Sequence, residues 1–126
     1  MSKSVLIFVA FMLATIFSNH AYATAEVKSE ANTVIYVKNT CDHYEYFWMS
    51  CSMDYSQSID VAPGATVPFT FTPNQVQVGW VCQGSNEKDG DDETVCSKLT
   101  NGSTINLVPA KDAIGISYCK TECPKN

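Results

Sequence analysis

Arginine is absent from this chain of 126 residues, and every one of its eight basic residues is lysine. The arginine guanidinium is the side chain best suited to phosphates and to the edges of nucleic acid bases. Thirteen acidic residues also give the chain a net charge of −5. We therefore expect no nucleic acid partner and no binding to anionic lipid, whereas a negative surface favours solubility or a basic partner.

Histidine is also scarce, with only His20 and His43 in the chain. A catalytic triad needs a nucleophile, a base and an orienting acid that meet in space. His43 lies in a turn between Asp42 and Tyr44, and no nucleophile motif accompanies it. We interpret His43 as a solvated turn residue, and we expect no catalytic residue and no enzyme activity. Scattered Asp and Glu residues, which no motif organises, leave a small secreted hydrolase as the alternative.

Long apolar runs are missing after the first 17 residues. The one such run, Val5 to Phe17, follows a lysine and precedes Ala21-Tyr22-Ala23, which is the pattern of a cleavable secretory signal. It is shorter than the roughly 20 residues that cross a bilayer. We expect residues 1–23 to be a cleaved signal peptide, the product to be secreted and extracellular, and no membrane insertion. The remaining chain has seven lysines against thirteen acidic residues, a net charge of −6.

Cysteine, in contrast, is plentiful. Six cysteines follow the expected signal: Cys41, Cys51, Cys82, Cys96, Cys119 and Cys123. An even number of cysteines in an exported chain predicts three disulfides. We expect Cys82–Cys96 to close the polar loop between them, and Cys119 and Cys123 to reach different partners. The Cys119-x₃-Cys123 spacing is also near that of zinc ligands, but oxidation favours disulfides, so we expect no metal and no cofactor.

Short segments with period-two alternation follow one another along the chain, and none after the signal has helical periodicity. The expected strands are residues 33–38, 44–51, 58–61, 66–72, 76–82, 94–99, 103–107 and 113–119. This pattern predicts an all-β fold, a small antiparallel β-sandwich of about seven to eight strands stapled by disulfides. We expect residues 24–32 to be a flexible N-terminal segment and residues 33–126 to form the single domain.

Alternation also predicts which side chains face the core. We expect three apolar sets to share one core: Val67, Phe69 and Phe71; Val76, Val78 and Trp80; Ile114, Ile116 and Tyr118. Pro68 cannot donate a hydrogen bond to a neighbouring strand, so its strand should lie at a sheet edge or be bulged there.

Two surface features are candidates for partner binding. Residues 44–49 are the densest aromatic run, with Tyr44, Tyr46 and Trp48 on one face of the expected strand. This face is either an exposed patch that anchors a partner or one side of a strand covered on both sides. Asp89, Asp91 and Asp92 lie in an acidic loop, which is a solvated loop, a surface that presents charge to a partner, or, as a third alternative, a calcium site.

Asn101-Gly102-Ser103 is a sequon for N-glycosylation in an expected turn. Asn101 is therefore a glycosylation candidate.

Several segments together carry a family resemblance: Val34–Asn39, Ser50–Asp54, Val61–Ala65, Phe69–Phe71 and Val78–Cys82. In this order they resemble the plant self-incompatibility protein (S-protein homologue) family, with Ser50 where the family has histidine. The resemblance covers Val34 to Cys82, and it implies a small secreted β-sandwich that acts as a ligand for a cell-surface receptor.

We accordingly expect a monomeric, secreted recognition or signalling ligand whose partner is an extracellular or membrane protein. The alternative is a secreted defence protein, an effector or a hydrolase inhibitor that inserts an exposed loop, residues 83–93, into its target.

Overall fold

The computed structural model describes residues 31–86 and 94–125 of the chain. The expected signal peptide, residues 1–23, lies outside the described residues, as does nearly all of the N-terminal segment 24–32. Within the described part, no helix is long and apolar enough to cross a membrane.

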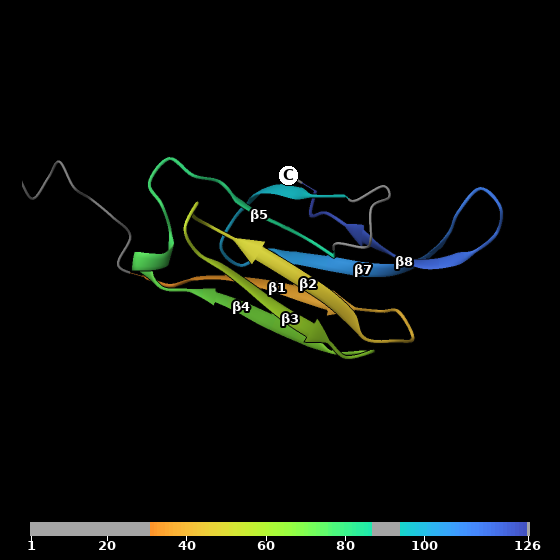
Figure 1. Cartoon of the computed structure of the whole chain (residues 1–126). Helices are drawn as coiled ribbons and strands as arrows, with labels where there is room; N and C mark the ends of the chain where they lie inside the picture. The colour runs from red at the N-terminus through yellow and green to blue at the C-terminus, as the bar shows by residue number, and fades with distance from the viewer. Residues whose placement is uncertain (1–30, 87–93, 126) are drawn as a thin grey trace, which may run out of the picture.

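The described residues form strands almost throughout (Figure 1). The strands are β1 (Thr33–Asn39), β2 (Glu45–Ser50), β3 (Ser56–Val61), β4 (Thr66–Phe71), β5 (Cys82–Ser85), β6 (Cys96–Leu99), β7 (Thr104–Lys111) and β8 (Ser117–Glu122). A single turn of 3₁₀ helix, η1 (Pro73–Gln75), follows β4. The all-β prediction is confirmed.

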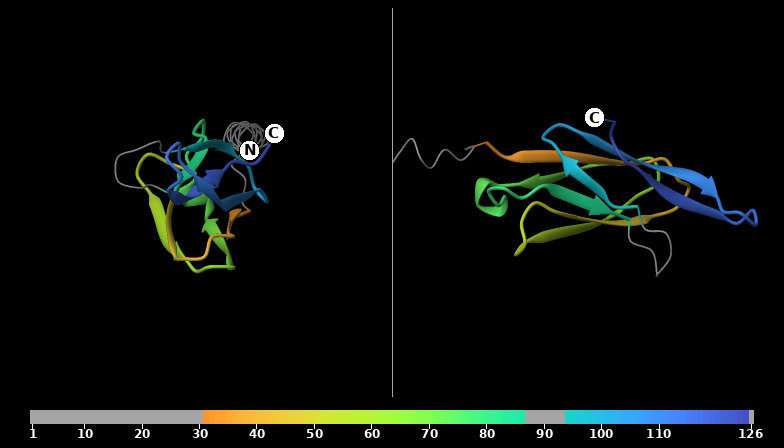
Figure 2. Two further views of the ribbon diagram at one scale, coloured as in Figure 1. Left: turned by 90° about the vertical axis from the view of Figure 1, so that its right-hand side faces the viewer. Right: turned by 90° about the horizontal axis from the view of Figure 1, so that it is seen from above.

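The strands form two sheets of four, in the orders β4-β1-β7-β8 and β3-β2-β5-β6. The two sheets pack against each other as the layers of a sandwich (Figure 2). Pairing is antiparallel except between β1 and β7, where Tyr36–Asn39 run parallel to Thr104–Leu107. The expected antiparallel sandwich is therefore confirmed, with this one parallel pair among the described strands, because β7 enters from the other sheet and runs in the direction of β1.

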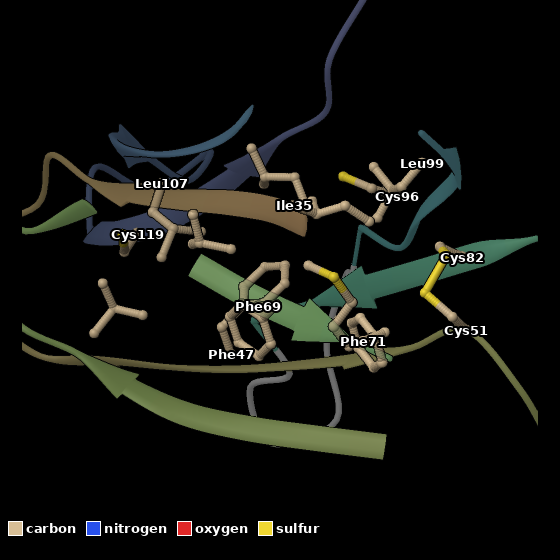
Figure 3. Packing of buried hydrophobic residues seen from close by; sticks show 14 of the residues in the cluster. Ile35, Phe47, Cys51, Phe69, Phe71, Cys82, Cys96, Leu99, Leu107 and Cys119 are labelled. Carbon is tan, nitrogen blue, oxygen red and sulfur yellow. A yellow bond between two sulfur atoms is a disulfide. The ribbon is translucent and has the colours of Figure 1, made fainter. Parts of the chain in front are cut away.

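The core lies between the sheets and is aromatic at its centre (Figure 3). Phe47 of β2 and Phe69 of β4 are fully buried, and their ring centroids lie 5.8 Å apart in an edge-to-face arrangement. Phe71 is also fully buried and Val67 packs against the core, so the expected facing of β4 is confirmed. Pro68 lies on β4, an edge strand, as its missing N–H predicts.

The segment 76–81 is not the strand that its alternation predicts. Gly79 adopts φ +79°, a left-handed conformation that few residues other than glycine tolerate, and Trp80 N–H donates to Gln77 O in a turn. Val78 is consequently exposed, and β5 begins only at Cys82.

The expected burial of Ile114, Ile116 and Tyr118 is also wrong, since all three are exposed. The inward residues of β8 are Cys119 and Thr121, so the facing of this strand is shifted by one residue from our expectation.

All six cysteines are paired, as Cys41–Cys119, Cys51–Cys82 and Cys96–Cys123. Cys119 and Cys123 have different partners, as expected, whereas the predicted Cys82–Cys96 bridge is wrong. Cys82 lies opposite Leu99 and Cys96 lies opposite Gly84, so the two cysteines are not cross-strand neighbours. Pairing of β5 with β6 already closes the loop that the disulfide was expected to close.

Candidate functional site

Strand β2 separates a core face from a solvent face. Glu45, Phe47 and Met49 point inward and are buried. Tyr46 and Trp48 therefore point outward, and Tyr44 lies just before the strand. Tyr44 is 67% exposed and Tyr46 is 46% exposed, so the interpretation that β2 is covered on both sides is wrong. We call Tyr44, Tyr46 and Trp48 the aromatic face.

Trp48 contributes to the aromatic face through part of its ring. The residue is half-buried, and its Nε1 is buried without a hydrogen-bond partner among the described residues. Its indole N–H does not reach solvent, so Trp48 offers a partner apolar contact area and not a hydrogen bond.

One carboxylate of the described residues, that of Asp60, borders the aromatic face. Asp60 of β3 lies directly opposite Tyr46 and is exposed. On the other side of β2, Ser85 of β5 lies opposite Trp48, and Ser85 Oγ donates to Thr94 O at 2.9 Å. Thr94, the first described residue after the acidic segment 87–93, therefore lies close to the residue opposite Trp48. Asp89, Asp91 and Asp92 themselves lie outside the described residues, as does the calcium alternative that rests on them.

The loop that presents Tyr44 is held by a buried asparagine that our sequence reasoning missed. Asn39 Nδ2 donates to His43 O at 2.8 Å and to Val61 O at 2.9 Å, and Asn39 Oδ1 accepts from Cys41 N–H at 2.9 Å. The Asn39 side chain is fully buried. Three hydrogen bonds from one side chain fix the turn between β1 and β2, and with it the place where Tyr44 leaves the sandwich.

His43 is an exposed residue in a bend, as expected, but it also makes two contacts with carboxylates that the sequence did not predict. Its Nε2 lies 2.5 Å from Oε1 of Glu45, which is only 3% exposed, and its Nδ1 lies 2.9 Å from Oδ1 of Asp42. The hydrogen bond and positive charge of His43 lower the pKa of Asp42 from its ordinary value. Both ring nitrogens thus face carboxylates, and we call these two contacts, which connect the loop before Tyr44 to Glu45 of β2, the His43 brace.

A second exposed apolar element is the end of the β7–β8 hairpin, which extends beyond the sandwich (Figures 1 and 2). Pairing of β7 with β1 ends at Leu107, so Val108–Lys111 pair only with β8. Thr40 N–H and Oγ both donate to Leu107 O, so the backbone groups of Leu107 point toward β1. The backbone of Pro109, two residues later in β7, points the same way, but β1 has ended there, so the N–H that proline lacks would have no strand partner.

The turn of this hairpin is ordered by one carboxylate. Asp112 Oδ1 accepts from Ile114 N–H at 3.0 Å and from Ile116 N–H at 2.8 Å. Gly115 adopts φ +85° and donates its N–H to Asp112 O. These bonds hold Ile114, which is 81% exposed, and Ile116 in solvent. The alternation of Ile114 and Ile116 is the same as that of a buried strand, so alternation alone did not reveal this exposed turn. Asp112 and Gly115, which are common turn residues, are the signal in the sequence that could have revealed it.

The Cys41–Cys119 disulfide joins the loop before Tyr44 to the base of the hairpin. The loop 40–44 and the turn 112–116 lie at the same end of the sandwich, which we call the binding end (Figure 1).

Metal chemistry finds no support in the described residues. The zinc alternative is wrong for Cys119 and Cys123, because both are oxidised. Among residues 31–86 and 94–125, no group of three or more His, Cys, Asp or Glu side chains is placed to hold a metal ion.

Comparison of the chain with protein-family models, with curated proteins and with solved structures found no significant match.

Proposed function

We propose that this protein is a secreted recognition ligand that binds an extracellular or membrane protein through its aromatic face. The single observation that carries the proposal is the exposure of Tyr46 on β2, a strand whose other side is the core, together with the exposure of Tyr44 just before it. Large aromatic side chains with few rotatable bonds are the residues that most often dominate the affinity of protein interfaces. Three disulfides and a buried asparagine make their support rigid, so little ordering is needed on binding.

Charge defines the kind of partner. Asp60 lies opposite Tyr46, and Ser85, two residues before the acidic segment 87–93 in the sequence, lies opposite Trp48. Aromatic rings next to carboxylates suit lysine and arginine side chains, through cation–π contacts and ion pairs. The partner that we propose therefore carries a basic, partly apolar patch. Its identity as a cell-surface receptor is the role that the resemblance to self-incompatibility proteins implies.

Binding of the labelled, secreted protein to cells of the producing organism tests this proposal. Tyr46→Ala should weaken saturable binding by about tenfold or more, which is the effect of losing an interface anchor. Tyr36→Ala is the matched control, because Tyr36 is comparably exposed on the outer face of the other sheet. Raising the salt concentration should weaken binding of the wild type, because salt screens the attraction between its carboxylates and a basic partner. Equal affinities for the wild type and Tyr46→Ala would refute the proposal.

The alternative function, inhibition of a hydrolase, is favoured by one observation. The turn 112–116 projects from the sandwich and holds Ile114 in solvent, a shape that suits insertion into an apolar cleft. For this alternative we propose the β7–β8 hairpin as a second candidate for the inserting element; residues 87–93 of the loop expected from the sequence lie outside the described residues. Titration against a panel of secreted hydrolases tests it: Ile114→Asp should abolish inhibition while Tyr46→Ala preserves it.

A further inference from the structure

The turn between β6 and β7 presents the side chain of Asn101, whose two polar atoms differ in their hydrogen bonding. Asn101 is exposed, and its Oδ1 accepts a hydrogen bond from Val34 N–H at 2.8 Å. Gly102, at φ +87°, donates its N–H to Val34 O at 2.7 Å. Asn101 Nδ2 makes no hydrogen bond within residues 31–86 and 94–125. The fold thus needs the carbonyl oxygen of this side chain and leaves its amide nitrogen in solvent.

We propose that Asn101 is the attachment site of an N-linked glycan. The third sequon residue, Ser103, keeps its hydroxyl in the same turn, bonded to the backbone of Thr100. The donor is a lipid diphosphate-linked oligosaccharide of the secretory pathway. A bond forms between Asn101 Nδ2 and the first sugar carbon, the bond from that carbon to phosphate breaks, and the lipid diphosphate leaves with the electron pair. Nδ2 loses one proton to a base.

The folded protein accommodates this product without losing a contact. An N-linked asparagine keeps its carbonyl oxygen, so the hydrogen bond from Val34 N–H persists. The surface next to the turn is partly apolar, because Val34 and the exposed Tyr36 lie on the outer face of β1 and Tyr36 N–H donates to Ser103 O. The first sugars would cover this part of the outer face.

The glycan lies away from the aromatic face and the hairpin. Strands β1 and β7 run parallel and both start at the Asn101 turn, whereas the binding end follows their other ends. Eight residues of β7 separate the two ends by roughly 25 Å, at about 3.3 Å per residue. A bulky, polar group at Asn101 therefore leaves Tyr44 and Ile114 accessible. The inference rests on export, which is part of the proposed function, but not on the choice of partner.

Expression of the full chain in a eukaryotic secretory host tests the proposal with four proteins: the wild type, Asn101→Asp, Ser103→Ala and Ser103→Thr. Asn101→Asp is the matched control, because aspartate keeps an oxygen for Val34 N–H but has no amide nitrogen. Ser103→Thr keeps both the sequon and the hydroxyl, whereas Ser103→Ala removes both. Gel mobility, digestion with an N-glycosidase that leaves aspartate at the site, and peptide mass mapping read the result.

The expected result is a glycosidase-sensitive mass increase on the wild type and Ser103→Thr, and none on Asn101→Asp or Ser103→Ala. Thermal unfolding of Asn101→Asp should match that of the deglycosylated wild type. Secretion of the wild type and Ser103→Thr with unmodified Asn101 would overturn the proposal and leave the proposed function intact. Retention of all four proteins in the cytosol with reduced cysteines would instead contradict export, and with it both proposals.

Discussion

Gly84 offers the sharpest test of which side chains of β2 point into the core, because it lies opposite Met49 in the β2–β5 pair and next to the Phe47 ring. A Cβ atom at this position would lie 2.8 Å from Cε1 of Phe47 and 2.8 Å from the backbone oxygen of Trp48. Neither neighbour is free to move. Phe47 is fully buried against Phe69, and the Trp48 backbone is paired with Ser85.

Gly84→Ala should therefore destabilise the protein. Overpacking of a tight core typically costs about 1–3 kcal/mol. For a domain of this size each kcal/mol lowers Tm by roughly 4–8 °C. Gly79→Ala is the control: it meets no atom within 4 Å but takes a side chain into φ +79°, which costs roughly 1–2 kcal/mol through backbone strain alone.

Combination with Phe47→Leu separates the two causes. The smaller leucine side chain makes room for the methyl group that Gly84→Ala adds, so the double variant Gly84→Ala/Phe47→Leu should lose less stability than the sum of its single variants. In the Gly79→Ala background the effects of Phe47→Leu should simply add. Thermal and urea unfolding measure these differences. A neutral Gly84→Ala, or strict additivity with Phe47→Leu, would show that Phe47 does not pack on Gly84, and the outward facing of Tyr46 and Trp48 would then lose its basis.

Two further predictions concern the binding end. Replacement of Cys41 and Cys119 by alanine opens a loop of 78 residues and should cost about 4–5 kcal/mol of unfolding free energy by loop entropy, so an unchanged Tm would contradict the anchoring role of this disulfide. Asp42→Asn tests the His43 brace through the pH dependence of stability. Because the pKa of Asp42 is lowered in the folded state, its carboxylate stabilises the fold at pH values above the ordinary pKa of aspartate. This stabilisation is lost as the pH falls through the lowered pKa. Urea unfolding should show the wild type and Asp42→Asn converging at the acidic end, and a difference that grows on acidification would contradict the brace.

Local alternation was enough to predict most of the sandwich from the sequence. Val67, Phe69 and Phe71 alternate with threonines and a proline, so both the inward face and the edge position of β4 followed from period two and the missing N–H of Pro68. Alternation likewise separated Tyr46 and Trp48 from Phe47 and Met49, but it left open whether the face with Tyr46 is exposed or covered.

What failed depends on contacts between distant residues. The sequence around Gly79 is compatible with a strand, and only the turn around Trp80 requires its positive φ. The side of β8 that faces the core depends on the disulfide between Cys119 and Cys41, which are 78 residues apart. Disulfide connectivity is likewise a property of the register between strands, which six cysteine positions do not define. His43 shows the same limit on a smaller scale, because its partner Glu45 is buried only once β2 packs on the core.

Photo-cross-linking on living cells tests the central claim, recognition through the aromatic face, most directly. A photoreactive phenylalanine analogue replaces Tyr46 in one secreted protein and Tyr36 in a second, and each is irradiated on cells of the producing organism. The account predicts one discrete adduct with an extracellular or membrane protein from position 46, suppressed by excess wild-type protein, and no such adduct from position 36. An adduct from position 36 alone, or none from either position under conditions where the wild type binds, would contradict it.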